Sequence, residues 1–445
     1  MSAKKRILNI LFWSVISAAF IGPGTVTTAA SSGAEYGTGL LWALLFSTLA
    51  CLLLQEAAAR ISIVTGRNLG QSISVYFEGR TSKAAVLILV LGAIFIGAAA
   101  YEMGNLLGAV EGIRLLFNIP SYILVLSIGI TAAILLSIPS LRIISTILGI
   151  LVVVMGIGFM VTAVMVKPDY TEIIKGAFIP SLPGPRAGVL VLALIGTTIV
   201  PYNLFLGSGL SSKSQTLKEM RFGLSIAIIM GGIFSMAVLI TGSAISGSFS
   251  FESLAAVLEE RIGGAGKYLL GFGLFAAGFT STVTAPLAAA VTLSSLFGRE
   301  QPGKWGHRST RFRAAWILVL CTGIGFALMN FKPVPAIILA QALNGFLLPF
   351  VSIFLYMVIQ KSIDRKSVIY NISNILMLAV IYVTLIIGLN NALKAVGALI
   401  VPGFVSTMPA QVIVAVLSMA VIIVVATGTG RRNRVNASTN RKNER

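Results

Sequence analysis

The chain has 445 residues, of which 56% are apolar and 11% are charged, and its mean hydropathy is +0.95. Soluble globular proteins are about 45–50% apolar and about 25% charged, so this composition excludes a water-soluble domain and a disordered chain. The single histidine, His307, and two cysteines, Cys51 and Cys321, leave too few ligands for a zinc site or for histidine-based hydrolysis. The sequence therefore predicts an all-α integral membrane protein.

Twelve apolar stretches are long enough to cross a bilayer, because a spanning helix needs about 20 apolar residues. They leave room for a single transmembrane domain over residues 1–445, with a basic cytoplasmic tail at 428–445 that we expect to be solvated and disordered. The stretches cover residues 7–34, 40–63, 84–108, 120–138, 142–166, 187–210, 222–246, 267–296, 313–331, 335–359, 371–393 and 410–427.

The basic residues indicate the orientation of these stretches. Of the 33 Lys and Arg residues, 25 lie in the termini and in the connections that share a side with them. By the positive-inside rule both termini are cytoplasmic, which predicts a multi-pass protein of the plasma membrane. The net charge of +19 is explained by orientation, so the expected partners are lipid and a transported cation or small solute rather than nucleic acid. No nucleotide-binding Gly-x-x-x-x-Gly-Lys-Ser/Thr loop is present, and we expect no cofactor.

Two of the twelve stretches are interrupted in the middle. The first contains Gly22-Pro23-Gly24, and the sixth contains Val200-Pro201. Proline removes a backbone donor and glycine tolerates open dihedrals, so each break frees polar backbone groups at membrane depth. One such break alone fits a simple kink. The matched positions predict two five-helix repeats of opposite orientation, about 7–166 and about 187–359, with peripheral helices at about 371–427 and a transport site between the breaks.

The side chains near these breaks are neutral oxygen and nitrogen groups. For Ser and Thr the competing interpretation is packing between helices, with the hydroxyl bonded to its own backbone. Gln341 and Asn344 lie one helical turn apart in the tenth stretch, and their amides are harder to leave unsatisfied. The candidate substrate-binding residues are Gly22, Thr25, Thr197, Tyr202, Asn203, Gln341 and Asn344, and the family resemblance described below adds Val200.

Charged residues at membrane depth are few, and each is a candidate for a function. Glu102 is the best available proton acceptor, although a purely interfacial place fits it equally well. Thr280 and Thr284 in the eighth stretch offer hydroxyls to a coupling ion such as sodium. Glu56 and Arg60 have the spacing of a helical ion pair, which favours a structural or gating role over substrate binding.

Four ordered blocks resemble the Nramp (natural resistance-associated macrophage protein) family of divalent-metal transporters. Residues 22–42 resemble the first-helix block of that family, which begins Asp-Pro-Gly-Asn and ends Leu-Leu-Trp. Residues 54–60, followed by 64–67, are similar to its second-helix signature. Residues 200–204 stand where the family has Met-Pro-His-Asn-Leu, and 340–349 resemble its tenth helix. The resemblance implies the LeuT-type fold, an inverted repeat of five plus five helices in which helices 1 and 6 are discontinuous.

The resemblance also assigns the family's metal-binding positions to this sequence. The Asp and Asn of the first break correspond to Gly22 and Thr25, and the sixth-helix carbonyl and Met correspond to Thr197 and Val200. Thr25 and Thr197 are therefore the candidate metal ligands. Two sixth-helix histidines of the family correspond to Tyr202 and Gly207, and its third-helix acids correspond to Glu102 and Asn105.

A site without a carboxylate or a thioether has a definite preference among ions. Carboxylates supply most of the attraction for a dication, and thioether sulfur selects soft transition metals. We therefore expect an ion-coupled secondary transporter that works by alternating access and moves a hard or partly hydrated divalent cation. A monovalent cation or a small polar or anionic solute is the alternative. An enzyme is less favoured, because no intramembrane histidine or paired carboxylate is present, and a channel is a further, less favoured possibility. The sequence leaves open the substrate, the coupling ion, the transport direction and the oligomeric state.

Overall fold

The computed structural model describes residues 22–138, 142–211, 216–298, 304–306, 308–362, 368–400 and 407–443. The start of the first predicted stretch, His307 and the 139–141 connection lie outside the described residues. The helices, in chain order, are α2 (Pro23–Tyr36), α3 (Leu41–Thr65), α4 (Leu69–Tyr76), α5 (Lys83–Arg114), α6 (Ser121–Ser137), α7 (Arg142–Met165), α8 (Tyr170–Phe178), α9 (Ala187–Thr198), α10 (Pro201–Leu210), α11 (Leu217–Gly242), α12 (Phe251–Ile262), α13 (Ala265–Phe297), α14 (Thr310–Leu328), α15 (Pro333–Ser362), α16 (Val368–Ile400) and α17 (Met408–Asn443).

The helices that can span a membrane coincide with the predicted stretches. In the part of the chain that the structure describes, ten segments are long and apolar enough to cross, and α9 and α10 together form one of them. The fourth predicted stretch is α6, an apolar helix of 17 residues. The described part of the first stretch is α2. The prediction of an all-α membrane protein is thus confirmed.

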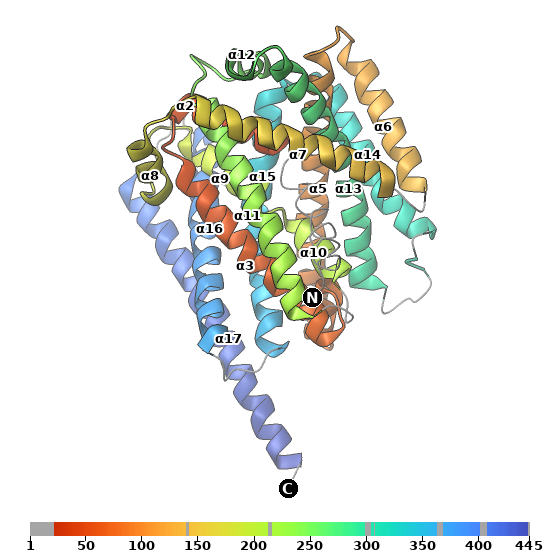
Figure 1. Ribbon diagram of the computed structural model, residues 1–445. Helices are drawn as coiled ribbons and strands as arrows, with labels where there is room; N and C mark the ends of the chain where they lie inside the picture. Colours follow the sequence, from red (N-terminus) through yellow and green to blue (C-terminus); the bar gives the residue numbers. More distant parts are fainter. Residues whose placement is uncertain are drawn as a thin grey trace.

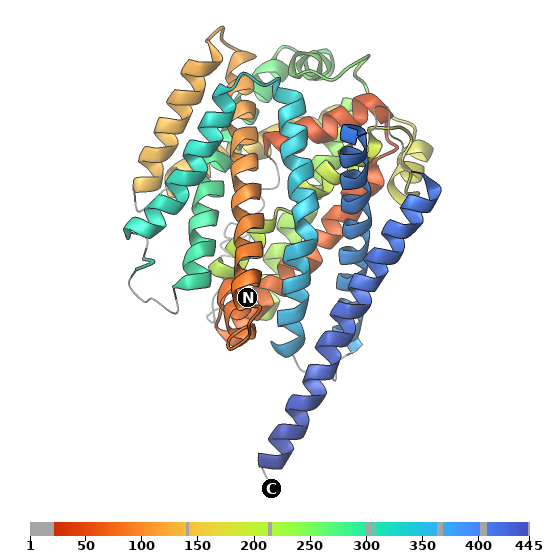
Figure 2. The ribbon, with the colours of Figure 1, turned by 180° about the vertical axis from the view of Figure 1, so that it is seen from behind.

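The long helices form a bundle in which α5 and α13 pack against each other, and α15 packs on both α5 and α9 (Figure 1). The half-helix α2 lies against α11, α9 and α15, so it is enclosed by the bundle. The last helix, α17, packs on α16 and α15 and extends beyond the end of the bundle (Figure 2). The two broken segments are consequently placed in the interior, surrounded by continuous helices.

Glycine allows α2 and α11 to approach very closely. A Cβ atom placed on Gly33 would lie 2.0 Å from the carbonyl oxygen of Leu239. On the other side of the same contact, a Cβ atom on Gly242 would lie 2.5 Å from the carbonyl oxygen of Ala30. Within a membrane, close backbone approach supplies much of the attraction between helices, because lipid is as apolar as leucine. This contact fixes α2 against a spanning helix.

The structure differs from the sequence-based expectation outside the spans. The short helices α4, α8 and α12 were not predicted, because each has 8 to 12 residues and lies in a connection where hydropathy gives no signal. The predicted disorder of the tail is wrong up to Asn443, because α17 continues to that residue. A spanning helix is already nucleated, so each further turn requires propagation only.

Candidate functional site

The sixth spanning segment is discontinuous at the predicted position. Helix α9 ends at Thr198 and α10 begins at Pro201, while Val200 between them is extended, with φ −81° and ψ 122°. Proline suits the first turn of α10 because the N–H it lacks would have no partner in the helix. The two half-helices therefore expose their ends to each other inside the bundle.

The first break also coincides with a helix end. Helix α2 begins at Pro23, and Gly22 before it is extended, with φ −92° and ψ 173°. The carbonyl oxygen of Gly22 accepts hydrogen bonds from the backbone N–H groups of Thr25, at 3.0 Å, and Val26, at 3.2 Å. Gly22 thus starts the helix, and its carbonyl, which we predicted as a substrate contact, is used within α2.

The two breaks face each other through a pair of threonines. The hydroxyl oxygens of Thr25 and Thr197 are 2.9 Å apart, and both side chains are buried. Tyr101 of α5 donates its phenolic hydroxyl to the carbonyl of Thr197 at 3.4 Å. The ring of Tyr202 meets the ring of Tyr101 edge to face, with the centroids 5.7 Å apart. Four helices, α2, α5, α9 and α10, therefore converge on one polar point.

Gln341 of α15 brings an amide to the same place. Its side chain is fully buried, and neither its amide oxygen nor its amide nitrogen has a hydrogen-bond partner within the described ranges. A Cβ atom on Gly24 would lie 2.2 Å from its Nε2 atom, and a Cβ atom on Gly104 would lie 3.6 Å from it. The amide is therefore located between the first break and α5. Leaving a buried polar group unsatisfied costs about 1–3 kcal/mol, which indicates a place for a ligand or for water.

The remaining predicted contacts differ in what they offer. Asn344 donates its amide nitrogen to the carbonyl oxygens of Gly97, at 3.3 Å, and Ala340, at 3.2 Å, so it connects α15 to α5. Asn203 is 2% exposed, and its amide nitrogen has no partner in the described part of the chain. Val200 supplies an aliphatic side chain, which is no ligand for an ion. Thr25, Thr197 and Gln341 thus form the polar centre of the site.

Glu102 lies outside this centre. A Cβ atom on Gly323 would lie 2.3 Å from the Cγ atom of Glu102, so this side chain packs against α14. Consecutive helical residues point about 100° apart, and Tyr101 points toward Thr197. Glu102 is fully buried, and its carboxyl group lies beside the amide of Asn105, which is less than one turn further along α5.

In α13, the hydroxyl that lies beside the first break is that of Ser281 rather than those of Thr280 and Thr284. Thr280 donates to the carbonyl oxygens of Ala276 and Ala277, and Thr284 donates to that of Ser281 at 3.4 Å, so both bond to their own helix. A Cβ atom on Gly22 would lie 3.7 Å from the hydroxyl oxygen of Ser281. Ser281 lies one helical turn from Gly278, which packs on α5, and this face of α13 became apparent only from the structure.

Glu56 and Arg60 form the predicted ion pair, with an N–O distance of 3.2 Å. Glu56 also accepts from Arg221 at 2.8 Å, which the sequence analysis missed because the two residues are far apart in the chain. The carboxylate therefore connects α3 to the beginning of α11. A gating role for this cluster stays a prediction.

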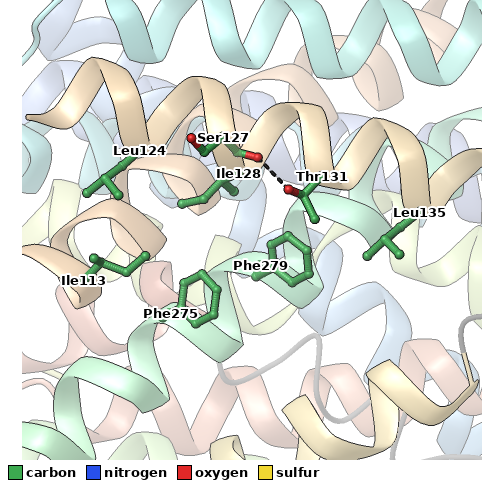
Figure 3. Close-up of a pocket in the computed structure, with 8 residues that line it drawn as sticks. All are labelled: Ile113, Leu124, Ser127, Ile128, Thr131, Leu135, Phe275 and Phe279. Atoms are coloured by element: carbon green, nitrogen blue, oxygen red, sulfur yellow. Dashed lines mark hydrogen bonds between the residues drawn. The ribbon is translucent and has the colours of Figure 1, made fainter. Parts of the chain in front are cut away.

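A cavity of about 450 Å³ lies elsewhere, between α6, α5 and α13 (Figure 3). Its two polar lining residues are Ser127 and Thr131, and the hydroxyl of Thr131 donates to the carbonyl of Ser127 at 2.7 Å. It contains none of the predicted site residues.

Across the described ranges, no group of three or more His, Cys, Asp or Glu side chains could hold a metal. Among the described residues, the side chains that converge between the breaks are neutral.

Comparison with known proteins gives concordant results. Residues 14–394 match the family described as natural resistance-associated macrophage protein-like. A divalent metal cation transporter, MntH, of Yersinia pestis (strain Pestoides F) is 26% identical over 332 residues, which cover 71% of this chain and 80% of that protein. The protein of the same name from Deinococcus radiodurans is 26% identical over 365 residues, 78% of this chain and 80% of its own length.

Two solved structures show the same fold. The manganese transporter of Eremococcus coleocola, in complex with an aromatic bis-isothiourea substituted compound, superposes with a TM-score of 0.69 at 18% identity, over 95% of this chain and 93% of that one. Mhp1, a nucleobase-cation-symport-1 family transporter, superposes with a TM-score of 0.56 at 14% identity, over 95% and 93%. These likenesses confirm the LeuT-type fold with discontinuous helices. The family match covers most of the chain, and the chain therefore belongs to the natural resistance-associated macrophage protein-like family.

Proposed function

We propose that the protein is a secondary transporter that moves a divalent metal cation across the membrane. The observation that carries this proposal is the polar cluster between the two helix breaks, where the hydroxyls of Thr25 and Thr197 are 2.9 Å apart and the unsatisfied amide of Gln341 lies beside Gly24. We propose that these groups line a pocket for the cargo. Its membership of a transporter family and the names of its relatives, divalent metal cation transporter and manganese transporter, support the choice of cargo.

The chemistry of the pocket supports a hard or partly hydrated ion. Hydroxyl and amide oxygens are ligands that magnesium and calcium accept, whereas soft transition metals prefer sulfur and imidazole. A site with no carboxylate leaves most of the charge of a dication uncompensated, so an ion that keeps part of its water shell suits it better. We therefore place magnesium ahead of manganese and iron as the cargo.

Alternating access requires the pocket to lie between parts that move relative to each other. Helices α2, α9 and α10 are short segments that end at the pocket, while α5, α13 and α15 are continuous. Helix α2 packs on α11, and α9 and α10 pack on α3. Glu56 of α3 pairs with Arg221 of α11 and so connects these two supporting helices. We propose that this group rocks against the continuous helices, which opens the pocket to one side of the membrane at a time.

Uptake of magnesium into proteoliposomes, measured with an internal fluorescent indicator, tests the proposal. We expect saturable uptake by the unaltered chain. Gln341→Ala removes the side-chain amide, and Thr197→Val replaces a hydroxyl with a methyl group. Each variant should lower uptake severalfold. Thr131→Val removes a hydroxyl far from the pocket and serves as the matched control, with uptake unchanged.

Manganese, sodium and a panel of polar solutes, tested in the same liposomes, show whether the cargo is correct. Uptake that prefers manganese over magnesium would overturn the hard-ion proposal and leave divalent transport standing. Movement of sodium or a solute with no divalent uptake would favour the alternative cargo. No flux of any probe in correctly folded protein would refute transport.

We further propose that Glu102 carries the coupling proton. Glu102 is a fully buried carboxyl group within the spanning helix α5, next in the chain to Tyr101, which contacts the polar centre of the site. Glu102→Gln keeps the shape and removes the titration. Uptake of the variant should lose its response to a pH gradient, and a response that is retained would exclude Glu102 from coupling.

We propose that the chain lies in the plasma membrane with both termini in the cytoplasm, as the distribution of basic residues indicates. A fusion of a fluorescent protein and a fusion of alkaline phosphatase to the C-terminus test this orientation. The first should be active and the second inactive, and the opposite pattern would reverse it.

A further inference from the structure

The short helix α8 has three distinct faces. Ile173, Gly176 and Ala177 are buried or partly buried against the protein. Thr171, Glu172 and Lys175 form an exposed polar face, on which Lys175 pairs with Glu172 at 3.1 Å. The third face is apolar and exposed, which is unusual for a helix that lies between two spans rather than within one.

The apolar face is formed by residues at a helical spacing of four. Tyr170, Ile174 and Phe178 are 77%, 60% and 72% exposed. The exposed surface continues beyond the helix into Ile179 and Leu182. On the preceding side it continues into Val164 and Met165, which are at the end of the spanning helix α7 and are exposed as well.

We propose that α8 is an interfacial helix whose apolar face, Tyr170, Ile174 and Phe178, binds the phospholipid bilayer at the boundary between head groups and acyl chains. An amphipathic helix lies in this plane when one face is apolar and the adjacent face is charged. Val164 and Met165, exposed apolar residues at the end of the spanning segment that precedes α8 in the chain, support the bilayer as its occupant. The exposed tyrosine suits the same boundary, where one end of the ring is apolar and the other is wet.

The protein-facing side of α8 and the segment after it hold the turn between α2 and α3. The Thr38 hydroxyl donates to the carbonyl of Glu172 at 3.1 Å, and a Cβ atom on Gly176 would lie 2.1 Å from the carbonyl oxygen of Thr38. The indole N–H of Trp42 donates to the carbonyl of Ser181 at 3.1 Å. A helix bound to the bilayer surface therefore also supports the end of the half-helix that carries Thr25.

Spin labelling tests the position of α8 in the bilayer. Cys51 and Cys321 are first replaced by alanine, and single cysteines are then introduced as Ile174→Cys, Phe178→Cys and Lys175→Cys. Each variant of the full chain is labelled with a nitroxide and reconstituted into phosphatidylcholine and phosphatidylglycerol vesicles. Collision rates with oxygen, which concentrates in lipid, and with a water-soluble nickel chelate report the depth of each label.

We expect the labels at 174 and 178 to collide severalfold more with oxygen than with the nickel chelate, and the label at 175 to show the reverse. Equal exposure of all three labels to the nickel chelate would overturn the proposal, because α8 would then lie in water. Protection of 174 and 178 from both reagents would overturn it as well and would indicate a protein partner on this face. Phe178 gives a second reading if the first variant does not fold.

Discussion

At the pocket, Gly24 lies beside the side-chain amide of Gln341. A methyl group on Gly24 would lie 2.2 Å from the amide nitrogen, which is the far end of a flexible side chain. We therefore expect Gly24→Ala to turn the amide away from the pocket without unfolding the protein. Uptake should fall about tenfold, which corresponds to about 1.4 kcal/mol, as measured in proteoliposomes.

A double variant separates this effect from general damage. If Gly24→Ala acts by displacing the amide, it should have little further effect in a chain that already carries Gln341→Ala. Fully additive losses would show that the two residues act independently, and that the amide does not contribute through its position beside Gly24.

Glu56 connects α3 to α11 through ion pairs with Arg60 and Arg221. Its side chain is 17% exposed, and that of Arg60 is 10% exposed, so the pair is shielded from much of the solvent. Glu56→Gln would leave Arg60 and Arg221 without their common anion. We expect a loss of about 1–3 kcal/mol and a lower melting temperature in detergent, because the variant removes the charge that the two guanidinium groups share.

The matched control for this variant is Glu172→Gln. The Glu172–Lys175 pair is 59% and 57% exposed, and such pairs contribute about 0–1 kcal/mol. Its melting temperature should therefore be close to that of the unaltered chain. Equal destabilisation by both variants would mean that Glu56 has no special role between α3 and α11.

At the scale of the helices, the contact between α2 and α11 leaves no space for a methyl group on Gly33. Gly33→Ala would place a methyl group 2.0 Å from a backbone oxygen, which cannot move without a shift of the whole helix. We expect a destabilisation of about 3 kcal/mol or failure to fold. Gly92→Ala in α5 is the control, because nothing lies within 4 Å of its added methyl group. It should stabilise the helix by up to about 1 kcal/mol, and equal melting temperatures for the two variants would contradict the contact.

At the scale of the whole molecule, the last helix is peripheral. The membrane-crossing part of α17 is only 11% buried within the protein, and the family match ends at residue 394, before this helix begins. A chain truncated after residue 407 should therefore keep most of its uptake. Loss of uptake in a truncated protein that still melts cooperatively would show that α17 contributes to transport.

The fold was largely predictable because hydropathy and proline report directly on membrane crossing. Val200-Pro201 marks the end of one half-helix and the start of the next, and Pro23 marks the start of α2. The connections carry no such signal, so α8 was missed although its apolar spacing of four is visible in retrospect. A segment of 9 residues is too short for a span and gives no hydropathy maximum.

The site was predictable only in its local parts. The proximity of Thr25, Thr197 and Gln341 was predictable because they lie next to the breaks or carry an amide at membrane depth, and their role in binding stays a prediction. The rotation of each helix about its axis depends on tertiary packing, which a single sequence does not report. This is why Ser281 was passed over in favour of Thr280, and why the direction of Glu102 toward α14 was not foreseen.

The neutral composition of the pocket has an electrical consequence. Thr25, Thr197 and Gln341 are neutral, so in the proposed transport cycle these side chains carry no charge through the field when the pocket returns empty. A divalent cargo then brings its whole charge to the loaded step, which a potential of 100 mV favours or opposes by about 4.6 kcal/mol. In the proposed transport cycle the membrane voltage therefore acts on the cargo and on the proton that Glu102 carries with it, rather than on the residues of the pocket.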